Sequence, residues 1–95
     1  MAVLESYIEK KVIAAAEAAG FMQRKVKYIN RNGAPDRWFF GPTGQLIIIE
    51  FKKAGEKPDP HQEREIKRLR DRGFKVYVID NVEDDDPAQD VVVTV

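Results

Sequence analysis

The sequence contains no cysteine and only one histidine, His61, among its 95 residues. Disulfide bonds, thiolate catalysis and cysteine-ligated zinc are therefore excluded, and a single chain cannot build a histidine-rich metal site. No apolar run approaches the length of a membrane span, and the N-terminal residues lack the hydrophobic region of a signal peptide. We therefore expect a cytoplasmic protein with no membrane partner.

Charge of neither sign prevails, because 16 Lys and Arg balance 16 Asp and Glu. The charges are unevenly distributed, however: residues 1–57 carry ten basic and six acidic side chains (+4), and residues 58–95 carry six and ten (−4). The acidic run 83–86 lies in an expected loop over about 81–88. A neutral chain gives no general support for binding nucleic acid, although the basic half can meet phosphate locally.

With 43% apolar and 34% charged residues, the chain has the composition of one globular domain over residues 1–95. Apolar residues at helical or alternating spacing, interrupted by glycine and proline, predict six elements in the order α-β-β-β-α-β. We expect an α/β fold with a small mixed sheet flanked by helices, and a further terminal strand over 91–95. The expected elements are a helix over 4–20, strands over 24–31, 37–40 and 45–53, a helix that begins after Asp59 and ends at Gly73, and a strand over 75–80.

An apolar strand that ends in charged residues is the most distinctive feature. The strand beginning at Leu46 runs directly into Glu50 and Lys52, which share one face because strand side chains alternate. Counting back through the hairpin loop places Asp36 opposite residues 49–50, where cross-strand Cβ atoms are about 5 Å apart. Two carboxylates this close repel each other unless a cation lies between them.

This arrangement suits metal-assisted hydrolysis of phosphodiesters. Proteins bind Mg²⁺ through one or two carboxylates together with water and substrate phosphate. A lysine beside the ion can orient or deprotonate the attacking water, or stabilise the charge that develops on the phosphate. Glu-x-Lys at a strand end, or Asp after Pro, is commonly structural when it stands alone. The combination across a hairpin favours a catalytic site.

The same residues carry a resemblance to a known family. Pro35-Asp36 is followed, after a hairpin, by Glu50-Phe51-Lys52, and Glu9 lies on the preceding helix. This pattern resembles the PD-(D/E)xK nuclease superfamily and, within it, the VRR-NUC (virus-type replication–repair nuclease) group. The resemblance spans about residues 5–82 and is carried by Glu9, Gly33-x-Pro35-Asp36-Arg37, Ile49-Glu50-Phe51-Lys52, Gln62 and the strand residues 76–80.

The resemblance implies a restriction-endonuclease-like core with a metal centre on the hairpin. By this resemblance, Asp36 and Glu50 would be metal ligands, with the Phe51 carbonyl as a third. The ion would be Mg²⁺ or Mn²⁺, and Lys52 would be the catalytic lysine.

Two further candidates lie on the expected helices. By the same resemblance, Glu9 would reach the metal directly or through water. It is preferred to Glu5, which can share its helix face, because its distance from the helix end at Gly20 matches related junction resolvases. Gln62 has two interpretations, which stay open: an active-site residue near the metal-bound water or phosphate, or a capping-box partner of Asp59.

Basic side chains are the candidates for contact with DNA phosphates. His61, at the head of the second helix, is expected to be a surface residue that does not contact DNA. Trp38 and Phe40 favour the core or a dimer interface over base stacking. The candidate DNA-binding residues are Lys25, Lys27, Arg31, Arg37 and Lys53.

The function implied is a divalent-metal-dependent, structure-specific DNA endonuclease that does not act on small molecules. Small stand-alone members of this group resemble Holliday-junction resolvases, whose symmetrical cleavage predicts a homodimer on branched DNA. Small chains of this kind are typical of phage or mobile elements, which implies a bacterial or phage-infected host cell. The alternatives are a less selective flap, nick or single-strand nuclease, a non-catalytic DNA-binding module, and a purely structural interaction protein.

Overall fold

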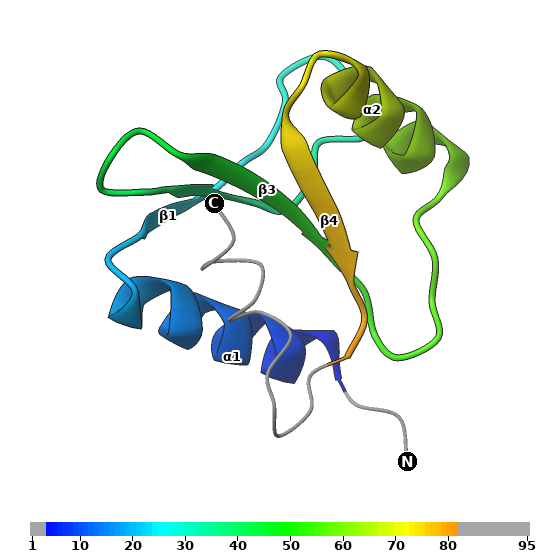
Figure 1. Ribbon diagram of the computed structural model, residues 1–95. Helices are drawn as coiled ribbons and strands as arrows, with labels where there is room; N and C mark the ends of the chain where they lie inside the picture. Colours follow the sequence, from blue (N-terminus) through cyan, green and yellow to red (C-terminus); the bar gives the residue numbers. More distant parts are fainter. Residues whose placement is uncertain (1–3, 82–95) are drawn as a thin grey trace.

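The computed structural model describes residues 4–81, which form two helices and a four-stranded sheet (Figure 1). The order α-β-β-β-α-β confirms the predicted fold class. The predicted strand over 91–95 and the acidic run 83–86 lie outside the described residues. The elements are α1 (Glu5–Ala18), β1 (Met22–Lys25), β2 (Arg37–Phe40), β3 (Leu46–Phe51), α2 (Pro60–Asp71) and β4 (Lys75–Ile79).

The sheet is mixed and lies between the two helices. Its strand order is β1-β2-β3-β4, with antiparallel pairing from β1 to β3 and parallel pairing between β3 and β4. Figure 1 shows α1 on one face of the sheet and α2 on the other, each packing on its own core cluster. In the part of the chain described, neither helix is long and apolar enough to cross a membrane.

β3 is buried on both of its faces. Ile47 and Ile49 pack with residues of α1 in the larger core cluster, whereas Ile48 packs with Ile66 of α2 in the smaller one. A central strand covered on both sides has no solvent face, which explains its unbroken apolar run. Each such side chain contributes roughly 1.5–3 kcal/mol when fully buried. The strand that carries Glu50 is therefore firmly held.

α2 begins and ends as the sequence predicts. The Asp59 side chain accepts a hydrogen bond from the Gln62 N–H at 2.9 Å, and the Gln62 side chain accepts one from the Asp59 N–H at 3.0 Å. This capping box fixes the head of the helix. At the other end Gly73 has a φ of 89°, and the Phe74 N–H donates to the Leu69 carbonyl at 3.2 Å, which completes a glycine-terminated end.

β1 is shorter than the alternating pattern predicts, because the strand expected over 24–31 ends at Lys25. β1 pairs only with the four residues of β2. Beyond these pairs the Val26 N–H donates to the Asp36 carbonyl, at 3.0 Å, before the chain leaves the sheet. The chain instead turns through Asn30 and Gly33, which have φ values of 63° and 97°. What the pattern predicted as the outer half of a strand is a loop between β1 and β2.

Candidate active site

Asp36 and Glu50 meet where β2 begins and β3 ends. Arg37 pairs with Ile49, so the preceding residue, Asp36, lies across from Glu50, as counting back along the hairpin predicts. The Asp36 Oδ2 atom accepts a hydrogen bond of 2.9 Å from the Phe51 N–H, which holds this carboxylate against β3. Glu50 therefore lies on β3 and Asp36 directly before β2, and one short hairpin joins these two strands.

Glu50 is buried, with 1% of its surface exposed. Its Oε2 atom accepts a hydrogen bond of 2.8 Å from the Gln62 Nε2 and lies 3.4 Å from the Lys52 Nζ. Its Oε1 atom is also buried and has no hydrogen-bond partner. An unpaired buried oxygen of this kind costs roughly 1–3 kcal/mol, and a cation would satisfy it.

The electrostatics of the pair also favour a cation. Burial, together with the nearby charge of Asp36, raises the pKa of Glu50 to about 7, against the opposing effect of the Lys52 ammonium. A divalent ion between the carboxylates would offset both the desolvation and the repulsion. Within residues 4–81, no three Asp, Glu or His side chains gather as a metal site. The oxygens present fit Mg²⁺ or Mn²⁺, whose other ligands are commonly backbone carbonyls, water and substrate phosphate.

The Phe51 carbonyl is directed to the same place. In an extended strand the N–H and C=O of one residue point to the same side, and the Phe51 N–H points to Asp36. Pairing between β2 and β3 stops at Ile49, because β2 begins at Arg37. This direction supports the Phe51 carbonyl as a third ligand, a role that stays a prediction.

Gln62 makes the predicted capping contact and also contacts Glu50, whereas a role near metal-bound water or phosphate stays a prediction. Its side-chain oxygen accepts the Asp59 N–H of the capping box, while its side-chain nitrogen donates to Glu50 at 2.8 Å. The same amide therefore caps α2 and orients the buried carboxylate, so the head of the helix is tied to the end of β3. The neighbouring His61 is exposed, as expected.

Glu9 contacts Arg37 and does not join the carboxylate pair in a three-carboxylate group among the described residues. The Arg37 Nε donates to the Glu9 Oε2 at 2.6 Å, and its Nη1 donates to the Gln23 Oε1 at 2.6 Å. Glu9 thus lies against the first residue of β2, directly after Asp36 in the chain, whereas Glu5 is exposed. A role for Glu9 at the metal stays a prediction. The Arg37 guanidinium holds this glutamate and is only 19% exposed, which weakens its case for contact with DNA.

The other basic candidates lie at the surface. Lys25 and Lys27 are exposed, and the side chain of Arg31 is 58% exposed. Lys53 pairs with the exposed Glu56 at 3.1 Å. These cations are accessible to phosphate, and contact with DNA stays a prediction for each. Of the aromatic candidates, Trp38 packs against the smaller core cluster, as the core interpretation expects.

The sequence reasoning missed Glu65, a second buried carboxylate. It is 8% exposed and accepts hydrogen bonds from the Tyr28 hydroxyl at 2.7 Å and the Arg68 Nε at 3.1 Å. The bond from Tyr28, more than any other contact, lowers the pKa of Glu65, whereas burial and the carboxylate raise the pKa of Tyr28 to about 12. A signal was available, since Glu65 adjoins Ile66 on the buried stripe of α2.

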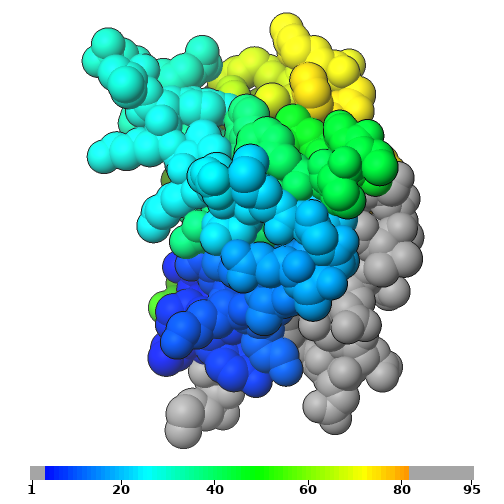
Figure 2. All heavy atoms as spheres, turned by 90° about the vertical axis from the view of Figure 1, so that its left-hand side faces the viewer, coloured from blue at the N-terminus to red at the C-terminus, as the bar shows by residue number. Residues whose placement is uncertain are grey.

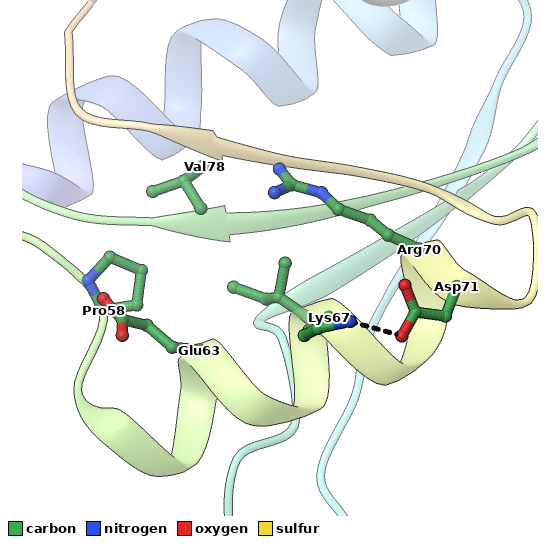
Figure 3. Close-up of a pocket in the computed structure, with 7 residues that line it drawn as sticks. Pro58, Glu63, Lys67, Arg70, Asp71 and Val78 are labelled. Atoms are coloured by element: carbon green, nitrogen blue, oxygen red, sulfur yellow. Dashed lines mark hydrogen bonds and ion pairs between the residues drawn. The ribbon is translucent and has the colours of Figure 1, made fainter.

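A pocket of about 410 Å³ between α2 and β4 is separate from this site (Figure 3). Arg70 donates to the Val76 carbonyl at 3.0 and 2.7 Å, and Lys67 pairs with Asp71 at 2.7 Å. None of the candidate catalytic residues lines the pocket. Three of its charged side chains, Lys67, Arg70 and Asp71, thus make contacts within the protein.

Comparison with known proteins places the chain in a class. No family model matches it. It is 38% identical over 79 residues to "Putative nuclease p44" of Acyrthosiphon pisum secondary endosymbiont phage 1, across 83% of this chain and 85% of that protein. It also matches a solved structure described as "VRR_NUC domain", with 41% sequence identity and a TM-score of 0.79, across 81% of this chain and 84% of that one.

These similarities and the fold define a nuclease. The chain belongs to the VRR-NUC family, as the resemblance in its sequence implies.

Proposed function

We propose that this nuclease is a divalent-metal-dependent DNA endonuclease of the PD-(D/E)xK type. The observation that carries the proposal is the buried Glu50, which lies near a second carboxylate, Asp36, and has one unpaired oxygen, Oε1, while its other oxygen is 3.4 Å from the Lys52 Nζ. A strand end with a purely structural role would not be stabilised by a carboxylate that is buried, close to a second negative charge and paired through only one of its oxygens.

Each residue of the site has a distinct role in this proposal. Asp36, Glu50 and the Phe51 carbonyl would hold Mg²⁺ or Mn²⁺, which when bound supplies Lewis-acid polarisation and a more acidic water. The Lys52 ammonium, next to Glu50, offsets the negative charge that develops on the phosphate during attack. Gln62 keeps Glu50 in the orientation that leaves Oε1 available.

The proposed substrate is branched DNA, cut by a homodimer in the manner of a junction resolvase. A single small domain has little surface for reading sequence, so DNA shape is the more accessible signal. One chain carries one site, and symmetrical cleavage of a four-way junction needs two sites related by a two-fold axis.

The test is cleavage of a labelled four-way junction, a matched linear duplex and a flap, each with Mg²⁺, Mn²⁺ or EDTA. Glu50→Gln removes the buried charge, and Glu56→Gln is the matched control because it alters an exposed glutamate nearby. We expect metal-dependent, paired cuts in the junction that Glu50→Gln reduces on the order of a thousandfold and Glu56→Gln leaves unchanged.

The other outcomes are equally informative. Cleavage that favours flaps or single strands would retain the metal-dependent nuclease and reject the resolvase. Cleavage that persists in EDTA, or in Glu50→Gln, would reject the proposed site. Binding to DNA without cleavage of any substrate would reject the endonuclease in favour of a DNA-binding module.

A further inference from the structure

The β1–β2 loop, residues 26–36, closes on itself beside the carboxylate pair. The Val26 N–H donates to the Asp36 carbonyl at 3.0 Å, so the loop returns to the sheet at a residue that is also a candidate metal ligand. Loops whose ends meet in this way frequently carry function, because a rigid scaffold presents them. In Figure 2 this cyan segment projects from the body of the molecule.

The base of the loop is fastened to α2. The Tyr28 hydroxyl donates to the buried Glu65 at 2.7 Å. Gly33 lies so close to the helix that a Cβ atom there would come within 2.8 Å of the His61 carbonyl oxygen. The loop is therefore held against the head of α2, the same segment in which Gln62 orients the buried carboxylate of the site.

The tip of the fastened loop presents one apolar side chain to solvent. Ile29 is 87% exposed, more than any other large hydrophobic residue that the structure describes. The chain turns at Asn30, which has a φ of 63°. Lys27 and Arg31 flank the tip in the sequence and line a polar hollow of about 520 Å³, and the Arg31 side chain, 58% exposed, lies 4.0 Å from the Glu65 carboxylate. An apolar tip between two cations is complementary to a partner that combines apolar stacked rings with anionic phosphates.

We propose that Ile29 is an apolar wedge that inserts at the unstacked base step of a DNA branch point, with Lys27 and Arg31 on the flanking phosphates. The inference rests on the proposed function, since it assigns substrate selectivity to the same site. Inserting an aliphatic side chain into continuous duplex requires unstacking of a base step. At a branch point that stacking is already interrupted, so the wedge is accommodated at lower cost and favours branched over linear DNA.

The test is binding without cleavage, measured in EDTA by fluorescence anisotropy. The probes are a four-way junction and a linear duplex of the same length, with 2-aminopurine at the branch point to report unstacking. Ile29→Ala is compared with Leu4→Ala, which shortens another exposed apolar side chain, 67% exposed and on a different element. Thermal unfolding checks that both variants fold, as expected for exposed positions.

We expect Ile29→Ala to weaken junction binding about tenfold, to leave duplex binding unchanged and to reduce the 2-aminopurine signal. Lys27→Gln should weaken binding to both DNAs by a similar factor, because a phosphate contact does not distinguish them. Leu4→Ala should behave as wild type.

The wedge is rejected if Ile29→Ala keeps the wild-type ratio of junction to duplex affinity, or if the wild type shows no preference for the junction or binds neither DNA. Rejection of the wedge can be distinguished from rejection of the proposed nuclease function. Metal-dependent cleavage with an unaltered ratio in Ile29→Ala would retain the nuclease and reject the wedge. An Ile29-dependent junction preference without cleavage in Mg²⁺ would retain the wedge and reject the endonuclease.

Discussion

Among single residues, the protonation state of one carboxylate, Glu50, links the proposed site to the stability of the fold. Glu50 is buried and lies opposite Asp36. One of its carboxylate oxygens accepts a hydrogen bond and the other has no hydrogen-bond partner. Its raised pKa means that the metal-free fold prefers the protonated form and is strained when the group ionises. If Glu50 is the proposed metal ligand, function and the stability of the metal-free fold oppose each other at this position.

Glu50→Gln should make the metal-free protein more stable although it strongly reduces cleavage. The pKa of Glu50 is about 7 in the folded protein, against an ordinary value of 4.5. The stability that the protonated Glu50 side chain contributes to the wild type is therefore fully present below pH 4.5 and is lost as pH rises through 7. At pH 8 the variant should gain on the order of 2–3 kcal/mol, since glutamine keeps an acceptor for Gln62 and carries no charge.

Urea unfolding in EDTA at pH 4.5 and pH 8 measures this difference. The two proteins should have similar free energies of unfolding at the lower pH and diverge at the higher one. A variant that is less stable than wild type at pH 8 would show that the carboxylate stabilises the fold and is not strained there.

At the scale of elements, the β1–β2 loop and the head of α2 form one support for the site. Gly33 adopts a φ of 97° and packs against the His61 carbonyl, while Gln62, one residue further along α2, holds Glu50. A change that separates the loop from α2 should therefore disturb the orientation of the carboxylate.

Gly33→Ala should destabilise the protein more than Gly44→Ala. Gly44 has a similar φ of 92° but nothing within 4 Å of its added Cβ, so it isolates the backbone penalty of about 1 kcal/mol. The added contact with the His61 carbonyl should bring the cost of Gly33→Ala to about 3 kcal/mol. Urea unfolding compares the two variants, and equal losses would show that the loop does not bear on α2.

The helices and strands also show which structural features can be predicted from a sequence pattern. The Asp36, Glu50 and Lys52 arrangement was predictable because strand alternation and hairpin counting are local rules. The extent of β1 was not, since it depends on where its partner strand lies, and β2 begins only at Arg37. The bonds of Gln62 to Glu50 and of Tyr28 to Glu65 depend on how α2 docks, which the spacing of residues along one helix does not specify.

At the scale of the whole molecule, the zero net charge separates into two parts. All 16 Lys and Arg lie within residues 4–81, together with 11 of the 16 Asp and Glu. The described residues therefore carry 16 minus 11, or +5, and residues 82–95 carry −5. A cationic body joined to an acidic segment sets up competition between that segment and a polyanionic substrate.

Neutralising the acidic run should strengthen binding to DNA. The combined change Glu83→Gln, Asp84→Asn, Asp85→Asn and Asp86→Asn is expected to raise affinity for duplex and junction alike on the order of tenfold at low salt. The gain should shrink towards none as salt shortens the screening length. Anisotropy titrations in EDTA over a series of salt concentrations measure it, and a gain independent of salt would contradict an electrostatic origin.

The most direct test of the central claim is calorimetric titration of Mn²⁺ into the wild type, Asp36→Asn, Glu50→Gln and the surface control Glu56→Gln. We expect saturable binding to the wild type and to Glu56→Gln, and a loss of that binding in both Asp36→Asn and Glu50→Gln while each variant remains folded. Wild-type affinity for Mn²⁺ in Glu50→Gln would contradict the claim that the carboxylate pair of Asp36 and Glu50 is the metal centre of this nuclease.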